Sequence, residues 1–381
     1  MTPARCTTRL AIAVLILMVV AGCGAPSTVV PSPTPVPVIT STPANRATAT
    51  PPPTPTATTV PTALPTPTPG MSAEARAYLD QALDLMQQHS INRAQIDWTR
   101  LRRAAHTLVA NALTPADTYP AIKGALSSLG DGHHSMFLPP DQVAALQSGA
   151  LDAANPGPSG KLLDNGLAYL LVPGFVGPAE LAEGYAATVQ RLIRELDAAQ
   201  PCGWVVDLRR NNGGAMWPML AGIGPLLGEG QPGAFVAPDG QRTPWFYVDG
   251  QAGYGDSVQT ALESALVYPP LDPLPPVAVL TGHMTFSSGE AVAVAFRGRP
   301  DTRGFGLETG GLTTANDEFP LSDGAWILLT VSRFADRTGK VYSGPIVPDE
   351  VVNPPETWPD PVLEAAAAWL LSQPACAGSS R

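Results

Sequence analysis

The chain has 381 residues, and its 32 acidic and 22 basic residues give a formal charge of −10 at pH 7. This surplus of negative charge excludes an extensive basic surface, so we expect neither nucleic acid nor anionic lipid as a partner. Of the 43 prolines, 14 fall within the short stretch 24–70, which leaves about 310 residues after it for a folded body.

The first residues have the features of an export signal. Arg5 and Arg9 precede an unbroken apolar run over residues 10–20, which is too short to span a bilayer. Two small residues and Cys23 follow, an arrangement that resembles the bacterial lipoprotein signal, in which the cysteine is acylated. We predict a signal peptide over residues 1–22 and an extracytoplasmic protein held at the membrane only by a lipid on Cys23. An ordinary signal peptide with a chance cysteine is the alternative.

Residues 23–70 are predicted to be a disordered, lipid-anchored linker. Residues 24–70 contain 14 prolines, 13 threonines and a single charged residue, Arg46. No hydrophobic core can form from this composition, and the prolines favour an extended tether of roughly 3.1 Å per residue.

The folded body contains two cysteines, Cys202 and Cys376. An exported chain permits a disulfide between them, and two separate buried thiols would give the same pattern. Neither a CxxC pair nor a His/Cys cluster with zinc spacing occurs, so we expect no metal and no cofactor.

Residues 71–135 are predicted to form a helical cap subdomain. Leu79, Leu83 and Met86 repeat at helical spacing, and a further apolar set ends at Gly130. Thr114 followed by proline is typical of a helix start. We predict three short helices.

Residues 136–381 are predicted to form an α/β core, because short apolar strands alternate with helices. A hairpin is expected around Ser322-Asp323-Gly324. The expected strands are 166–172, 203–208, 276–280, 319–321 and 326–331, and the expected helices are 179–199, 216–227, 290–297 and 361–371.

Ser287 lies between a predicted buried strand and a predicted helix. A serine there sits in the positive end of the helix dipole, where free backbone amides can face a developing negative charge. The same residue with Glu290 also fits a capping box, which only starts a helix. The segment by itself favours capping over catalysis.

Gly213 and Gly214 follow the predicted strand 203–208 and allow the backbone to approach a substrate closely. Their amides are candidates for an oxyanion hole, and a turn that merely needs glycine is the alternative. Asp207 and Arg209, just before them, are expected to pair and brace the loop.

His133 and His134 lie in a turn bounded by glycines at the exit of the helical region. A neutral imidazole can take the proton of a serine and return it to a leaving amine. Alone, either histidine is weak evidence for a catalytic site.

Together, the segments 130–135 (GDGHHS), 205–214 (VVDLRRNNGG) and 285–290 (TFSSGE) resemble the C-terminal processing, or tail-specific, serine peptidase family, which includes the tricorn core. The resemblance covers roughly residues 72–355, and the nisin-resistance peptidase group is the most similar branch. It implies a crotonase-like (ClpP/crotonase) spiral α/β core under the helical cap. It also implies Ser287 as the nucleophile, and an oxyanion hole from the Ser288 amide and either Gly213 or Gly214.

Members of that family differ in their general base. One branch uses a lysine about 25 residues after the serine, and the matching position here holds Leu312. The other branch uses the histidine of the Asp-Gly-His motif, which the resemblance places at His133. His134 stands where the branch has a smaller hydroxyl residue, so the choice between the two histidines stays open.

Many of these peptidases carry a PDZ domain before the core. Only about 30 residues separate Ser135 from the strand at Gly166, fewer than a PDZ domain needs, so we expect none. We then expect the groove between the helical subdomain and the sheet to select the substrate.

The sequence therefore predicts a serine peptidase that cuts extended or unfolded peptides, near their C-termini, with no cofactor. The alternative is a non-catalytic lipoprotein that binds a peptide or a hydrophobic ligand, as a receptor or an immunity protein.

Overall fold

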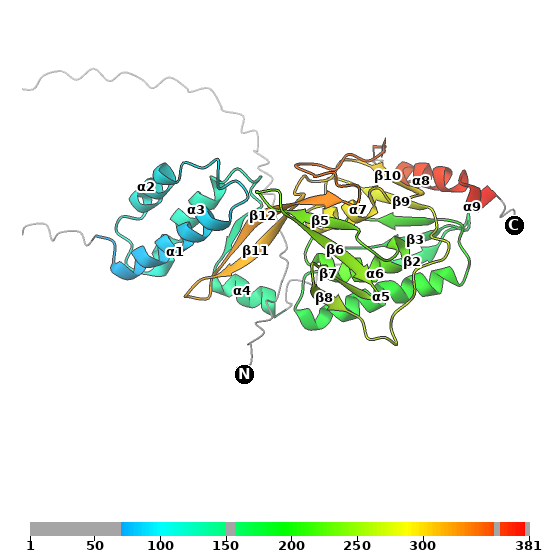
Figure 1. The fold of residues 1–381 in the computed structure, drawn as a ribbon, viewed down its shortest axis with the longest axis horizontal. Helices are drawn as coiled ribbons and strands as arrows, with labels where there is room; N and C mark the ends of the chain where they lie inside the picture. Colours follow the sequence, from blue (N-terminus) through cyan, green and yellow to red (C-terminus); the bar gives the residue numbers. More distant parts are fainter. Residues whose placement is uncertain (1–69, 149–156, 354–358, 378–381) are drawn as a thin grey trace, which may run out of the picture. The chain divides into compact units, whose positions relative to one another are not determined.

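The computed structural model describes residues 70–148, 157–353 and 359–377 (Figure 1). The predicted signal peptide, Cys23 and nearly all of the predicted tether lie outside these residues. Within the described ranges, no helix has the length and apolar character needed to cross a bilayer.

The three helices expected in the N-terminal part of the body are present. They are α1 (Ala73–His89), α2 (Trp98–Leu108) and α3 (Tyr119–Ser127), with a 3-10 turn at Pro115–Thr118. The Ser72 hydroxyl begins α1 by accepting a hydrogen bond from the Ala75 amide at 3.0 Å, which is the usual N-cap.

The core of this helical part includes residues from much later in the chain. Strands β11 (Thr314–Pro320) and β12 (Trp326–Asp336) form a long hairpin, and Ile327 and Leu329 pack with the buried faces of the helices. The hydroxyl groups of Tyr78 and Tyr119 both donate to the Asp323 carboxylate in the hairpin turn. The helical part is therefore completed by the hairpin, and the boundary between residues 135 and 136 stays a prediction.

A six-stranded sheet forms the centre of the body, in the order β13-β10-β9-β4-β3-β2. Neighbouring strands from β13 to β3 are parallel, and β2 is antiparallel to β3. The strands are β2 (Ser159–Leu162), β3 (Ala168–Leu171), β4 (Trp204–Asp207), β9 (Val277–Thr281), β10 (Thr302–Gly306) and β13 (Glu350–Val351).

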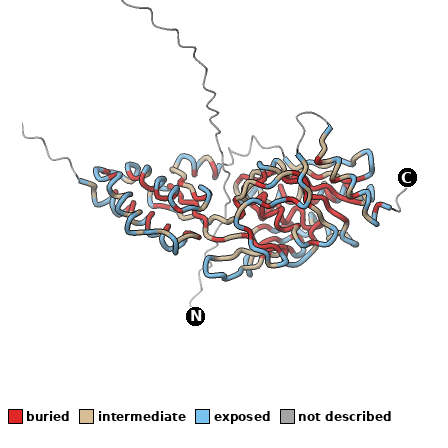
Figure 2. Tube along the Cα trace, turned by 90° about the horizontal axis from the view of Figure 1, so that it is seen from above, coloured by how far each residue is buried: buried red, intermediate tan, exposed pale blue. Residues whose placement is uncertain are grey.

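Helices cover both faces of this sheet. Helices α5 (Ala179–Asp197), α6 (Met216–Leu227) and α7 (Ser288–Phe296) share a core with Val206 of β4, whereas α8 (Pro361–Leu371) packs with Val205 on the opposite face. Figure 2 shows the resulting concentration of buried residues in the sheet-bearing part. Because both faces of the sheet are covered, the sequences of β4 and β9 are almost entirely apolar and do not alternate with polar residues.

The second sheet is antiparallel and has seven strands, in the order β1-β12-β5-β6-β7-β8, with β11 paired to β12. Its remaining strands are β1 (Met136–Leu138), β5 (Gly233–Val236), β6 (Arg242–Val248), β7 (Gln251–Tyr254) and β8 (Ser257–Ala261); α4 (Pro140–Gln147) follows β1. The expectation of an α/β core with antiparallel hairpins is confirmed at this level.

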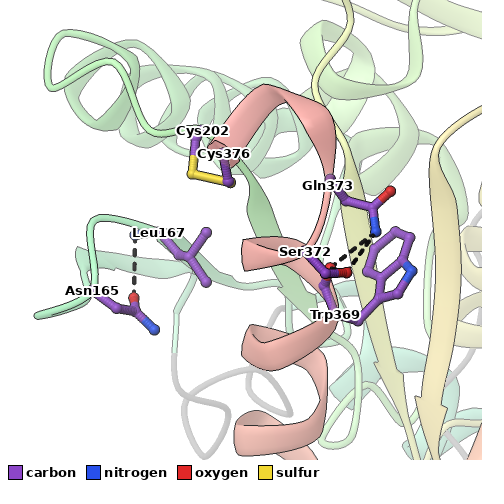
Figure 3. The surroundings of a disulfide bond; sticks show 7 residues. All are labelled: Asn165, Leu167, Cys202, Trp369, Ser372, Gln373 and Cys376. Atoms are coloured by element: carbon purple, nitrogen blue, oxygen red, sulfur yellow. Dashed lines mark hydrogen bonds between the residues drawn. A yellow bond between two sulfur atoms is a disulfide. The ribbon is translucent and has the colours of Figure 1, made fainter. Parts of the chain in front are cut away.

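Cys202 and Cys376 form a disulfide with a Cα–Cα distance of 4.9 Å. It joins the segment before β4 to the short helix α9 (Pro374–Ala377), next to the end of α8 (Figure 3). Of the two alternatives that the sequence left open, a disulfide and two separate thiols, the structure has the disulfide.

Parallel strands place their carboxyl ends at one edge of a sheet, where α/β proteins bind ligands. Strands β4 and β9 are neighbours, with Asp207 opposite Leu280. The loop that contains Gly213 and Gly214, called the glycine loop below, follows β4, and the segment that contains Ser287 follows β9. The topology therefore brings these two motifs to the same edge.

Candidate active site

Ser287 lies at the turn from β9 into α7 and is the N-cap of that helix. Its backbone has φ 49° and ψ −115°, a conformation that costs free energy for a residue other than glycine. The Ser287 amide donates to Glu290 Oε2 at 2.9 Å, which is one half of a capping box. The turn thus serves as a helix cap and also holds Ser287 in an unusual conformation.

His134, and not His133, lies against this serine. His134 Nε2 is 3.1 Å from Ser287 Oγ, and its side chain is buried, with 2% of the residue exposed. His133 is exposed and has a positive φ of 64°. The expectation that placed His133 at the nucleophile is wrong in this respect, because consecutive residues of the turn project in different directions.

The opposite ring nitrogen of His134 has a partner that sequence reasoning missed. Thr314 Oγ1, at the start of β11, lies 2.6 Å from His134 Nδ1. Asn316 Nδ2 also donates to the His134 carbonyl oxygen at 2.9 Å. Nothing in the sequence around Thr314 linked it to a histidine 180 residues earlier.

Burial controls the protonation of His134. Loss of hydration lowers the pKa of the ring to about 4, and the negative charge of Asp131 acts in the opposite direction. Asp131 Oδ2 accepts a hydrogen bond from the Ser135 hydroxyl, which holds the carboxylate in this turn. The imidazole is therefore neutral at pH 7 and able to accept a proton.

Gly213 and Gly214 both have positive φ angles, of 101° and 105°. A Cβ on Gly213 would lie 3.1 Å from the Ser287 Cβ, and one on Gly214 would lie 1.9 Å from the Phe175 carbonyl oxygen. Only glycine allows this close approach, as expected for the loop.

The amides of this loop differ in their partners. The Gly213 amide donates to Asn211 Oδ1 at 3.1 Å. In the described part of the chain, neither the Gly214 amide nor the Ser288 amide donates a hydrogen bond. The Ser288 hydroxyl donates to the Gly214 carbonyl oxygen at 2.5 Å, so these two residues are held together next to Ser287.

Asp207 and Arg209 brace the loop, as expected. Arg209 Nη2 lies 2.6 Å from Asp207 Oδ2, and Arg209 Nη1 lies 2.7 Å from Asp360 Oδ2 at the start of α8. One guanidinium thus pairs with both carboxylates and ties the end of β4 to the start of α8.

The position expected for a lysine base holds a buried leucine. Leu312 is 8% exposed, and its Cδ2 lies 3.7 Å from where a Cβ on Gly132 would stand. It packs beside the histidine turn. The Phe286 ring packs directly over Gly310. A Cβ added to Gly310 would lie only 1.8 Å from this ring.

No group of His, Cys, Asp and Glu side chains in the described ranges has an arrangement that could hold a metal ion. The assembled groups are a hydroxyl, a neutral imidazole and two backbone amides. This set can transfer an acyl group through a covalent intermediate.

The comparisons with known proteins agree with this chemistry. The model of peptidase family S41 matches residues 166–352, which include Ser287 and the glycine loop but not His134. The chain is 28% identical over 297 residues to the nisin-resistance protein of Lactococcus lactis subsp. lactis, covering 78% of this chain and 87% of that protein.

Two solved structures have a similar fold. A lipoprotein from Streptococcus agalactiae has a TM-score of 0.64 and 23% identity, covering 79% of this chain and 97% of its own. The C-terminal processing protease of photosystem II has a TM-score of 0.54 and 16% identity, covering 80% and 99%. The shared fold, the matched family model and the similar relative agree, and residues 166–352 of the chain belong to peptidase family S41, the family of the C-terminal processing and tricorn-core peptidases.

Proposed function

We propose that the chain is a lipid-anchored, extracytoplasmic serine peptidase in which Ser287 is the nucleophile and His134 the general base. The observation that supports this most directly is the 3.1 Å contact between Ser287 Oγ and His134 Nε2 at a helix N-terminus. His134 replaces His133 in the role that the sequence suggested.

In this mechanism, neutral His134 takes the hydroxyl proton while Ser287 Oγ attacks the carbonyl carbon of the scissile peptide bond. Thr314 Oγ1 accepts a hydrogen bond from the Nδ1–H group of His134, which leaves Nε2 unprotonated and able to act as the base. His134 then gives its proton to the leaving amine as the carbon–nitrogen bond breaks. Water hydrolyses the resulting ester on Ser287 by the same route.

The oxyanion would be held by the amides of Ser288 and Gly214. Both belong to residues beside the nucleophile and have no acceptor in the described part of the chain. The Gly213 amide is the weaker candidate, because it already donates to Asn211. The helix dipole of α7 adds positive potential at the same place.

The substrates we propose are extended or unfolded peptides, cut near their C-termini, as in the family to which residues 166–352 belong. The name of the nisin-resistance protein makes nisin the first peptide to test. We further propose that the core is of the crotonase-like spiral type.

The proposed location rests on the lipoprotein-like signal at Cys23 and on the solved lipoprotein with a similar fold. A Cys23→Ala variant is expected to leave the membrane fraction. If it stays there, the lipid is not the anchor.

A fluorophosphonate probe and peptide mass spectrometry test the proposed chemistry together. The unaltered protein is expected to be labelled and to release peptide fragments, and Ser287→Ala to do neither. Ser127→Ala, at an exposed serine of α3, is the matched control and should keep both activities. Peptide binding without label or fragments would support a non-catalytic receptor or immunity protein instead.

A further inference from the structure

Glu290 is a fully buried carboxyl group in the first turn of α7, with 0% of the residue exposed. Burial raises its pKa to about 7, and hydrogen bonds from Thr309, Gly311 and Ser287 act in the opposite direction. A buried carboxylate with no cationic partner is costly. A residue needed only to start a helix has no reason to be buried in this way.

The two oxygens of this carboxyl group bind two separate segments. Oε2 accepts from the Ser287 amide at 2.9 Å. Oε1 accepts from the Thr309 hydroxyl at 2.5 Å and from the Gly311 amide at 2.9 Å. Glu290 therefore connects the nucleophile turn to the loop that follows β10.

That connection acts on a strained residue. Ser287 has φ 49°, a conformation that persists only when surrounding contacts enforce it. An ionised carboxylate at a helix N-terminus is favoured by the dipole and accepts stronger hydrogen bonds than a neutral acid. The charged form therefore holds the Ser287 amide most firmly.

We propose that ionised Glu290 is a positioning residue that holds Ser287 in its strained conformation, with the hydroxyl at His134, and that protonation of Glu290 releases this constraint. The proposal rests on the proposed function of Ser287. A protonated carboxyl group has one strong acceptor oxygen instead of two, so it cannot hold all three donors equally well. Activity would then rise with pH through the neutral range.

The surroundings of Glu290 leave few other groups to produce this pH dependence. The bounds of α6 and β9, which pack on α7, contain no ionisable side chain. On β12, which also contacts α7, Arg333 and Asp336 are ionisable, but burial and hydrogen bonds are the largest causes of the shift in the pKa of Glu290. Glu308 is exposed, and His134 lies beyond the nucleophile hydroxyl and titrates near pH 4.

The test is the pH profile of kcat/KM for peptide hydrolysis from pH 3.5 to 9. The unaltered enzyme is expected to lose activity in two steps on acidification, near pH 7 and near pH 4. Glu290→Gln should lose the upper step, and its rate at pH 8 should fall about tenfold to 100-fold because the nucleophile is misplaced. Glu308→Gln is the matched control and should keep both steps.

The variant Thr309→Val provides a second test of the pH dependence if Glu290→Gln fails to fold. It removes a hydrogen bond that lowers the pKa of Glu290, so the upper step should move to higher pH. An unmoved step, or a Glu290→Gln enzyme with the profile of the unaltered one, would overturn the proposal.

Hydrogen exchange of the Ser287 and Gly311 amides gives a reading that needs no catalysis. Protection, corrected for the intrinsic effect of pH, is expected to fall below pH 7 in the unaltered protein and to be low at all pH values in Glu290→Gln. If the protein hydrolyses no peptide but shows this protection, the proposed function fails and the positioning role stands. Equal protection in the two proteins would refute the positioning role even in an active peptidase.

Discussion

At the scale of single residues, two neighbouring histidines have different environments. His134 is buried between Ser287 and Thr314, whereas His133 is exposed with a positive φ. The difference comes from the turn and not from the chemistry of the side chains. It makes each histidine the natural control for the other.

We expect His134→Ala to lower kcat/KM at least about 100-fold, because general-base catalysis commonly contributes that much or more. His133→Ala should stay within about twofold of the unaltered enzyme, since this residue is exposed and His134 is the histidine hydrogen-bonded to Ser287. Initial rates on one peptide and probe labelling of Ser287 measure both effects. The reverse order of the two variants would restore His133 as the base.

The low pKa of His134 has a direct consequence for stability. Its pKa in the folded chain, about 4, is below its usual value of 6.5, so the unfolded chain binds the proton more readily. Titration of His134 therefore lowers the free energy of unfolding as the pH falls from 6.5 towards 4. Glu290 acts in the opposite direction, because its raised pKa makes the folded chain bind a proton that the unfolded chain releases between pH 4.5 and 7.

At the scale of elements, the site depends on loops that follow two adjacent parallel strands. The glycine loop after β4 lies against the turn after β9, and the loop after β10 is bound through Glu290. The histidine turn comes from the helical part and is fixed by β11 and β12, since Thr330 on β12 donates its amide to the Ser135 hydroxyl oxygen at 2.9 Å.

Gly214→Ala tests how closely these loops must approach. The added Cβ would lie 1.9 Å from the Phe175 carbonyl oxygen at a positive φ, so we expect a loss of unfolding free energy on the order of 3 kcal/mol and little activity. Gly184→Ala on α5 is the control, because nothing lies within 4 Å of its Cβ, and alanine should stabilise a helix by about 1 kcal/mol. Urea unfolding compares them, and equal stability of the two variants would contradict the close approach.

Sequence periodicity predicted the long, amphipathic or fully apolar elements well. The helix α6 was predicted at 216–227 with the bounds that it has, and strand β4 to within one residue at each end. No element was predicted over residues 228–275, where β5 to β8 form an antiparallel sheet. Those strands are short and half-exposed, so their sequences carry a weak alternating pattern; β5 pairs with the distant β12, and β6, β7 and β8 pair in turn with their neighbours along the chain.

At the scale of the whole molecule, the disulfide closes a long covalent loop of the chain. Cys202 and Cys376 are 174 residues apart and fasten α9 beside the start of β4. The charge of the body is negative, with few lysines, which is compatible with peptide substrates and unfavourable for nucleic acid.

Replacing both cysteines by serine is expected to lower the free energy of unfolding by about 2 to 5 kcal/mol, because the unfolded chain gains freedom when a long loop is opened. Thermal unfolding with and without reductant measures this. Reductant should lower the melting temperature of the unaltered protein to that of the double variant and leave the variant unchanged. An unaltered protein that ignores reductant would argue against a structural disulfide.

The sequence by itself located the Ser287 segment, the glycine loop and the α/β alternation, because each depends on local backbone chemistry or on periodicity within a few residues. It could not choose between His133 and His134, locate Thr314, or reveal that Glu290 connects two loops. Those contacts join residues up to 180 positions apart, and only the packing of β11, β12 and α7 around one edge of the sheet brings them within hydrogen-bonding distance.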